Sequence, residues 1–323
     1  MIHALSFTWN PSEGFDLGPI KLRIYSLMFV VAFGLGLYLT KKIFDREGES
    51  QEKLDKLFIY TLIATLLGAR LGHVFFYDWK YFSGHPAEIL LPFRWDENGK
   101  FEFTGFAGLA SHGAAIAIIL TMVWYSKKVI FRPLLWVLDR IVIAVTAGGI
   151  FVRIGNFFNS EILGNPIEGE PKPWYAVRFI RGEDSGEHSL KLYEAIKITG
   201  EKTADAAYKA IENNPSFADV LATIPYRHPA QLYEAFLYIF VFAILFYMYW
   251  KTNARKFHGL IFGVFLVLLW TVRFVVEFVK SSQGGFEKLS AFNALSTGQW
   301  LSIPFILVGF YLMFTAKKRV ETL

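Results

Sequence analysis

The chain has 323 residues, of which 54% are hydrophobic and 18% aromatic, and its mean hydropathy is +0.35. Charged residues make up 19% of it, fewer than the roughly 25% typical of soluble domains, and they gather between long apolar runs. This pattern excludes an ordinary soluble domain and indicates a polytopic membrane protein. The net charge of +5 does not imply a nucleic-acid partner, because cytoplasmic loops of membrane proteins are normally basic.

The apolar runs predict about seven transmembrane helices, and the fold class is therefore all-α and polytopic. Residues 1–21 are polar and lack the apolar region of a cleavable signal peptide, so the first span is expected to act as the insertion signal. A charged linker, residues 41–56, is expected between the first two spans. The predicted spans are residues 22–40, 57–77, 106–125, 134–158, 229–250, 259–279 and 300–315.

Residues 159–228 interrupt the series of spans. They are polar, mixed in charge and rich in Pro and Gly, and residues 204–213 have the pattern of a short amphipathic helix. We therefore predict a soluble head inserted between the fourth and fifth spans. The chain then divides into residues 1–158 with four spans, the head at 159–228, and residues 229–323 with three spans and a tail.

The orientation follows from the basic residues of the short loops. Lys and Arg concentrate after spans one, three, five and seven, in segments that include Lys41, Lys127, Lys251 and Lys317. The positive-inside rule places these segments in the cytoplasm. The N-terminus and the head are then expected outside, and the C-terminus in the cytoplasm.

Most polar residues within the spans fall at one depth, near the outer head groups, when the helix rise is taken as about 1.5 Å per residue. A charge at membrane depth costs about 2.5–3.5 kcal/mol on insertion scales and marks a functional site by default. Asp139 and Arg140, nearer the inner side, are the main exceptions. The residues at the common depth are Tyr25, Arg70, His73, His112, Arg153, Asn156, Gln231, Glu234, Arg273 and Glu277.

Two interpretations of this group stay open on the residues alone. The charges can brace the bundle, as an i,i+4 pair of Arg273 with Glu277 would, and Arg70 and Glu234 are expected to be structural. Alternatively, Arg153 and Arg273 form a phosphate clamp, because the guanidinium fork suits bidentate phosphate recognition. A phosphate at that depth is most naturally a phospholipid head group.

His112 also has two interpretations. A single histidine in a span is often a hydrogen-bonded core residue. With an ordinary pKa near 6.5, it is equally the natural general base at neutral pH. The flanking Gly108 and Gly113 would let a substrate or another backbone approach closely.

Several motifs resemble those of the prolipoprotein diacylglyceryl transferase family, and they follow in order over nearly the whole chain. They are residues 153–161 (RIGNFFNSE) with Gly164, 226–234 (YRHPAQLYE), 273–278 (RFVVEF), 298–304 (GQWLSIP), Tyr25, 68–70 (GAR) and 111–113 (SHG). Three features depart from the family: Ala114 and Ser160 stand where glycine is usual, and the head is longer.

The resemblance implies a bacterial inner-membrane enzyme that transfers the diacylglyceryl group of phosphatidylglycerol to the lipobox cysteine thiol of a prolipoprotein signal peptide. A thioether forms and glycerol phosphate leaves. The chain contains no cysteine, in keeping with a thiol that the substrate supplies. No metal or cofactor is expected, because two arginines can neutralise the departing phosphate.

The resemblance also implies roles for particular residues. His112 would take the proton of the thiol, whose ordinary pKa is about 8.5. Arg153 and Arg273 would bind the phosphate. The other expected substrate-binding residues are Tyr25 and Asn156 at the head group, Gly164 in the signature, and Glu277, which would hold Arg273.

Two alternatives remain open at this point. A transporter or flippase for an anionic phospholipid would use the same arginines without chemistry, although its site should lie nearer the midplane and between repeats. A lipid phosphatase is the weaker alternative.

Overall fold

A computed structural model describes residues 7–12, 14–17, 20–91, 93–95, 101–103, 110–181, 190–281 and 294–320. Within them, seven helices are long and apolar enough to cross a membrane, so the prediction of an all-α polytopic membrane protein is confirmed. These helices are α1 (Ile24–Glu47), α2 (Gln51–Phe76), α4 (Ser111–Tyr125) continued by η2 (Ser126–Ile130), α5 (Leu134–Phe158), α9 (Ala230–Lys251), α10 (Leu260–Val276) continued by η6 (Glu277–Val279), and α11 (Thr297–Thr315).

The predicted boundaries differ most around the charged linker. α1 continues to Glu47 and α2 begins at Gln51, so most of residues 41–56 are helical. Lys, Glu and Gln are good helix formers, and they extend both helices beyond the apolar runs. Ser50 caps α2 by accepting a hydrogen bond from the Lys53 N–H. The predicted start of the third span, at residue 106, lies outside the described residues.

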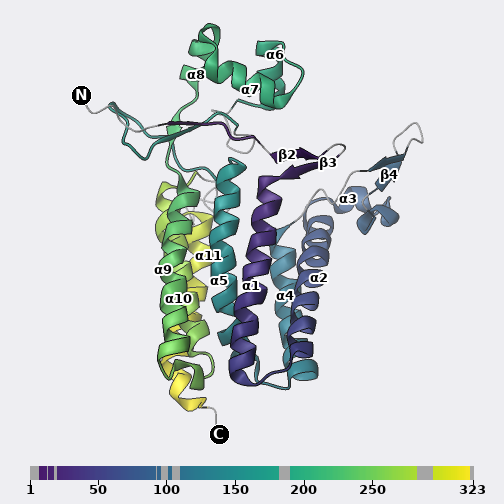
Figure 1. The fold of residues 1–323 in the computed structure, drawn as a ribbon, viewed down its shortest axis with the longest axis vertical. Coiled ribbons are helices and arrows are strands. Elements are labelled where there is room, and N and C mark those ends of the chain that lie inside the picture. Colours follow the sequence, from purple (N-terminus) through teal and green to yellow (C-terminus); the bar gives the residue numbers. More distant parts are fainter. Residues whose placement is uncertain are drawn as a thin grey trace. The chain divides into compact units, whose positions relative to one another are not determined.

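The chain forms two compact units, Met1–Gly36 with Val142–Leu323, and Leu37–Ile141. In the first, α5, α9, α10 and α11 run side by side as a bundle (Figure 1). Glycines bring α10 and α11 close together: a Cβ on Gly263 would lie 2.9 Å from the carbonyl oxygen of Gly309. Small residues at such contacts permit the tight helix packing on which membrane bundles depend.

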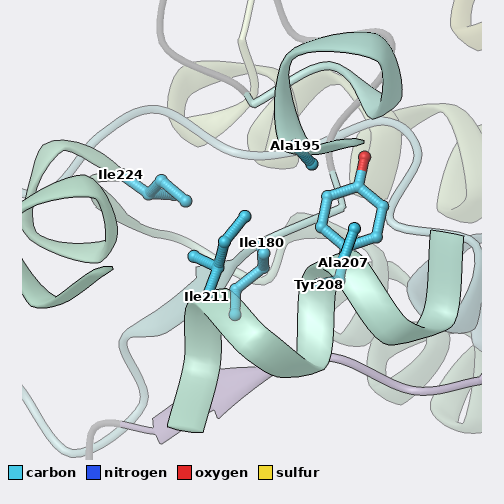
Figure 2. Packing of buried hydrophobic residues seen from close by; sticks show 6 residues of the cluster. All are labelled: Ile180, Ala195, Ala207, Tyr208, Ile211 and Ile224. Atoms are coloured by element: carbon cyan, nitrogen blue, oxygen red, sulfur yellow. The ribbon is translucent and has the colours of Figure 1, made fainter. Parts of the chain in front are cut away.

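Beyond one end of this bundle, the segment between α5 and α9 folds around its own apolar core (Figure 2). Ile180, Ala195, Ala207, Tyr208, Ile211 and Ile224 make up this core. The segment contains α6 (Leu192–Thr199), α7 (Ala204–Asn213), η4 (Pro215–Phe217) and α8 (Ala218–Thr223). The bounds of α7 confirm the predicted amphipathic helix.

Short strands near this segment were not predicted. β1 (Phe7–Trp9), β6 (Val177–Phe179) and β7 (Tyr226–Arg227) form a three-stranded sheet in the order β1-β6-β7, in which β1 is parallel to β6 and β6 antiparallel to β7. β2 (Gly14–Leu17) and β3 (Ile20–Arg23) form a hairpin before α1. Elements this short carry too few residues to show an alternating pattern. η5 (Ala254–Lys256) lies between α9 and α10, and η9 (Ala316–Lys318) follows α11.

The second unit contains α2 and α4, packed through glycines. A Cβ on Gly72 would lie 2.6 Å from the Cα of Gly113, and the Ala110 N–H donates to the Ala69 carbonyl at 2.9 Å. Arg70 is structural, as predicted: its guanidinium donates to two backbone carbonyls of η1 (Pro86–Ile89). The short elements of this unit are α3 (Trp79–Phe82), η1 (Pro86–Ile89), β4 (Phe93–Trp95) and its antiparallel partner β5 (Phe101–Phe103).

Candidate functional site

Arg153 lies in the last two turns of α5 and has a partner on each side. Its Nε lies 2.5 Å from Glu234 Oε2 of α9, and the two side chains are 14% and 3% exposed. Its Nη1 donates to Asn156 Oδ1 at 3.3 Å, one turn along α5. A buried arginine in a span needs such partners, because an unpaired charge there is costly. α5 and α9 together therefore fix the direction of this guanidinium.

The turn after α5 brings the Glu161 carboxylate back to Asn156. Asn156 Nδ2 donates to Glu161 Oε2 at 3.0 Å, and Asn159 donates to the other oxygen of that carboxylate. A Schellman turn produces this return: the Ser160 N–H bonds the Phe157 carbonyl, and the Glu161 N–H bonds the Asn156 carbonyl. Glu161 was not predicted as a site residue, although its place in the same sequence motif was a signal.

Tyr25 joins this group from the first turn of α1. Its hydroxyl is within hydrogen-bonding reach of the Asn156 side chain. Its ring packs on α5 at Gly155, where a Cβ would lie 3.0 Å from Tyr25 Cδ2. The absence of a side chain at Gly155 therefore makes room for the ring. The structure thus brings together Tyr25, Arg153 and Asn156, three of the residues predicted for one site.

Arg273, on α10, is backed by an aromatic stack. Its guanidinium carbon lies 5.4 Å from the centre of the Trp270 ring, and Trp270 stacks on Phe305 of α11 with ring centres 4.1 Å apart. In the described part of the chain, Arg273 Nε is buried and has no hydrogen-bond partner. A guanidinium held on an aromatic face in this way is suited to bind an anion.

Tyr238, on α9, lies beside Arg153. Its side chain is within hydrogen-bonding reach of Arg153, and Arg273 of α10 lies within electrostatic range of its hydroxyl. Two arginines from different helices are therefore electrostatic neighbours of one tyrosine. Sequence reasoning missed Tyr238, because a tyrosine in a span is counted as apolar. The signal was its position one helical turn after Glu234.

Glu277 does not pair with Arg273, which corrects the prediction. Its Oε2 lies 3.4 Å from Lys280 Nζ, and a Cβ on Gly298 would lie 2.5 Å from its carboxyl carbon. The helix tightens into the 3₁₀ turn η6 at this residue, and side chains three residues apart eclipse in that geometry. Lys280, rather than Arg273, is therefore the ionic partner of Glu277. A role of Glu277 in binding substrate stays a prediction.

Gly164 lies where three backbone segments meet. Its N–H donates to the His228 carbonyl at 3.1 Å, and its carbonyl accepts from Arg227 Nη1 at 3.2 Å and Ser281 Oγ at 2.9 Å. A Cβ on Gly164 would lie 2.8 Å from the carbonyl oxygen of Val279. Close backbone approach thus accounts for this glycine. Its contact with substrate stays a prediction.

His112 is the second residue of α4, but its side chain lies outside the described residues. It belongs to the second compact unit, whereas Tyr25, Arg153, Asn156 and Arg273 belong to the first. The assignment of His112 as the base therefore stays a prediction.

The fold and the site define a class of protein: a polytopic membrane protein with a polar, arginine-containing site among its spans. The sequence profile described as prolipoprotein diacylglyceryl transferase matches residues 13–315. The chain belongs to the prolipoprotein diacylglyceryl transferase family, as its motifs predicted.

Three relatives, each named phosphatidylglycerol–prolipoprotein diacylglyceryl transferase, are similar over almost their whole length. The chain is 34% identical to the protein of Chloroherpeton thalassium over 97% of this chain and 95% of the relative. It is 35% identical to that of Tolumonas auensis, over 94% and 95%. It is 33% identical to that of Bacteroides fragilis, over 98% and 97%.

Proposed function

We propose that this chain transfers the diacylglyceryl group of phosphatidylglycerol to the lipobox cysteine thiol of a prolipoprotein. The family and the names of the three relatives support this reaction. The chain itself contains no cysteine, so the sulfur comes from the protein substrate. In the transfer step, the thiol sulfur attacks the carbon of the diacylglyceryl group that is bonded to the phosphate oxygen. A carbon–sulfur bond forms, the carbon–oxygen bond to phosphate breaks, and glycerol phosphate departs.

The observation that carries the assignment of the site is the set of contacts that Arg153 makes with Glu234, Asn156 and Tyr238, with Arg273 within electrostatic range of Tyr238. A phosphate placed there would receive charge from two helices at once. Charge stabilisation by groups already in place is usually the largest contribution to catalysis, because they need no reorganisation during the reaction. Tyr25 and Asn156 would bind the head group, and His112 would accept the thiol proton.

We further propose that the protein lies in the bacterial inner membrane with its N-terminus and residues 159–228 outside and its C-terminus in the cytoplasm. The basic segments that follow spans one, three, five and seven support this orientation. A reporter active only outside the cytoplasm should be active when fused at residue 200 and silent when fused after residue 323. Activity of both fusions would contradict the proposed orientation.

The transfer is tested with purified protein, phosphatidylglycerol and a lipobox peptide. We expect the peptide mass to rise by one diacylglyceryl group, and a cysteine-to-serine peptide should stay unmodified. A transporter would leave the peptide mass unchanged, and a phosphatase would release inorganic phosphate instead of glycerol phosphate. Either of these results would overturn the proposed function.

A further inference from the structure

One face of α9 is polar and buried, which is unusual within a membrane span. Gln231, Glu234 and Tyr238 occupy positions i, i+3 and i+7, so they lie on one side of the helix, and they are 0%, 2% and 4% exposed. Burying polar groups is unfavourable unless each finds a partner. The polar stripe of α9 (Gln231, Glu234 and Tyr238) therefore needs polar partners.

Each member of the stripe contacts the candidate site. Gln231 Nε2 donates to the backbone carbonyl of Glu161, and Glu234 pairs with Arg153. Tyr238 is within hydrogen-bonding reach of Arg153, and Arg273 lies within electrostatic range of its hydroxyl. The first two contacts fix the loop after α5 and the guanidinium of Arg153. Tyr238 adds a second contact from α9 to that guanidinium, and the reaction outlined above assigns it no part.

The Tyr238 ring is held as well as its hydroxyl. A Cβ on Gly149 of α5 would lie 3.4 Å from Tyr238 Cδ2, which is ordinary van der Waals contact. The glycine lets the ring lie against α5, the helix that carries Arg153, and the hydroxyl is thereby held within hydrogen-bonding reach of that guanidinium.

We propose that Tyr238 is a positioning residue for the transfer reaction: its hydroxyl orients the Arg153 guanidinium toward the departing phosphate. This inference rests on the proposed function. A neutral phenol suits the role, because it accepts a hydrogen bond from a guanidinium group without neutralising it. A carboxylate at the same place would compete with the phosphate for the arginine.

The test is Tyr238→Phe, which keeps the ring against Gly149 and removes only the hydroxyl. The matched control is Tyr249→Phe, the same change at a fully buried tyrosine about 16 Å along the same helix. We expect kcat for transfer to fall on the order of 10-fold or more in Tyr238→Phe, because small misplacements of binding groups cost that much or more. The KM for the lipobox peptide and the melting temperature should stay close to wild type, and Tyr249→Phe should transfer normally.

A double-mutant cycle identifies the route by which Tyr238 acts. In an Arg153→Lys background, Tyr238→Phe should add little further loss, since groups that act as one unit are non-additive. A wild-type rate in Tyr238→Phe would overturn the inference and leave the proposed function intact. A clear fall in melting temperature together with the loss of rate would also overturn it, because Tyr238 would then only brace the bundle. Full additivity in the cycle would overturn it for the same reason. A wild-type protein that transfers nothing would overturn the proposed function and this inference with it.

Discussion

Glu234 of α9 holds Arg153 of α5: the carboxylate Oε2 lies 2.5 Å from the guanidinium Nε. Nη1 of the same guanidinium donates a hydrogen bond to Asn156 Oδ1. The pair explains how α5 carries an arginine within a span. It also leaves part of the Arg153 fork within hydrogen-bonding reach of Tyr238, and Arg273 of α10 lies within electrostatic range of that tyrosine. Glu234 is thus structural, as expected from the sequence, but what it supports is the site.

Removing the Glu234 carboxylate should therefore destabilise the protein. Glu234→Ala leaves a buried arginine without its charged partner, and breaking one side of a buried ion pair costs about 3–5 kcal/mol. We expect a clear fall in the melting temperature in detergent. Glu52→Ala is the matched control: it breaks the exposed Glu52–Lys56 pair of α2 and should leave melting unchanged. Equal melting of both variants would show that the Arg153–Glu234 pair does not support the fold.

Replacing Ser160 should have the opposite effect. Ser160 occupies the C′ position of the Schellman turn with φ 52°, a conformation that favours glycine, and its Oγ is buried without a hydrogen-bond partner among the described residues. Left-handed backbone at a residue other than glycine costs about 1–3 kcal/mol. Ser160→Gly should therefore raise the melting temperature.

Ser160→Ala separates the two contributions. It removes the buried hydroxyl but keeps the Cβ in the left-handed conformation. We expect Ser160→Gly to melt above Ser160→Ala. Equal melting of the two variants would show that backbone strain at this turn is negligible and that any gain over the wild type comes from removing the hydroxyl.

The sequence predicts the spans well, because bilayer thickness sets the length of an apolar run. The predicted bounds of α5 agree with the structure. Partners across helices could not be predicted in this way. Glu277 pairs with Lys280 because η6 changes the helical repeat, and no composition or hydropathy signal marks that change. Tyr238 was missed because the apolar body of a tyrosine hides its hydroxyl in a hydropathy profile.

The protein should lose stability on mild acidification through His228. Burial lowers the pKa of the His228 imidazole below its ordinary value of 6.5, because a low-dielectric environment disfavours the charged form. The folded state then favours the neutral ring, so this contribution to stability is complete above about pH 6.5 and is lost as the pH falls toward the lowered pKa.

The measurement for His228 is melting temperature against pH between about 5 and 8. His228→Gln keeps a polar side chain near Tyr233, whose hydroxyl lies 3.3 Å from His228 Nδ1, but has no group that titrates in this range. The variant should show a flatter profile below pH 6.5 than the wild type. Parallel profiles would assign the acid sensitivity to other groups.

His112→Ala should remove most of the transfer activity and leave the protein folded. The expected loss is about 10²–10⁴-fold, the usual contribution of a general base. The measurement is the initial rate with a lipobox peptide at neutral pH, together with melting temperature. A near-normal rate would exclude His112 as the base, and water or the lipid phosphate would then accept the thiol proton.

The last prediction concerns the two arginines. Arg153→Lys and Arg273→Lys keep the positive charge but lose the planar fork that binds a phosphate through two parallel hydrogen bonds. If the arginines bind the departing phosphate, each variant should lose transfer activity on the order of 10²-fold or more. Arg273→Lys should lose it with little change in melting temperature, because Arg273 Nε has no hydrogen-bond partner in the described part of the chain. Arg153→Lys should also melt lower, since the Glu234 pair depends on the guanidinium Nε.

Glu277→Gln should reduce the transfer rate less than either lysine variant, because Glu277 pairs with Lys280 and not with Arg273. A stable and active double lysine variant would show that the arginines only brace the bundle.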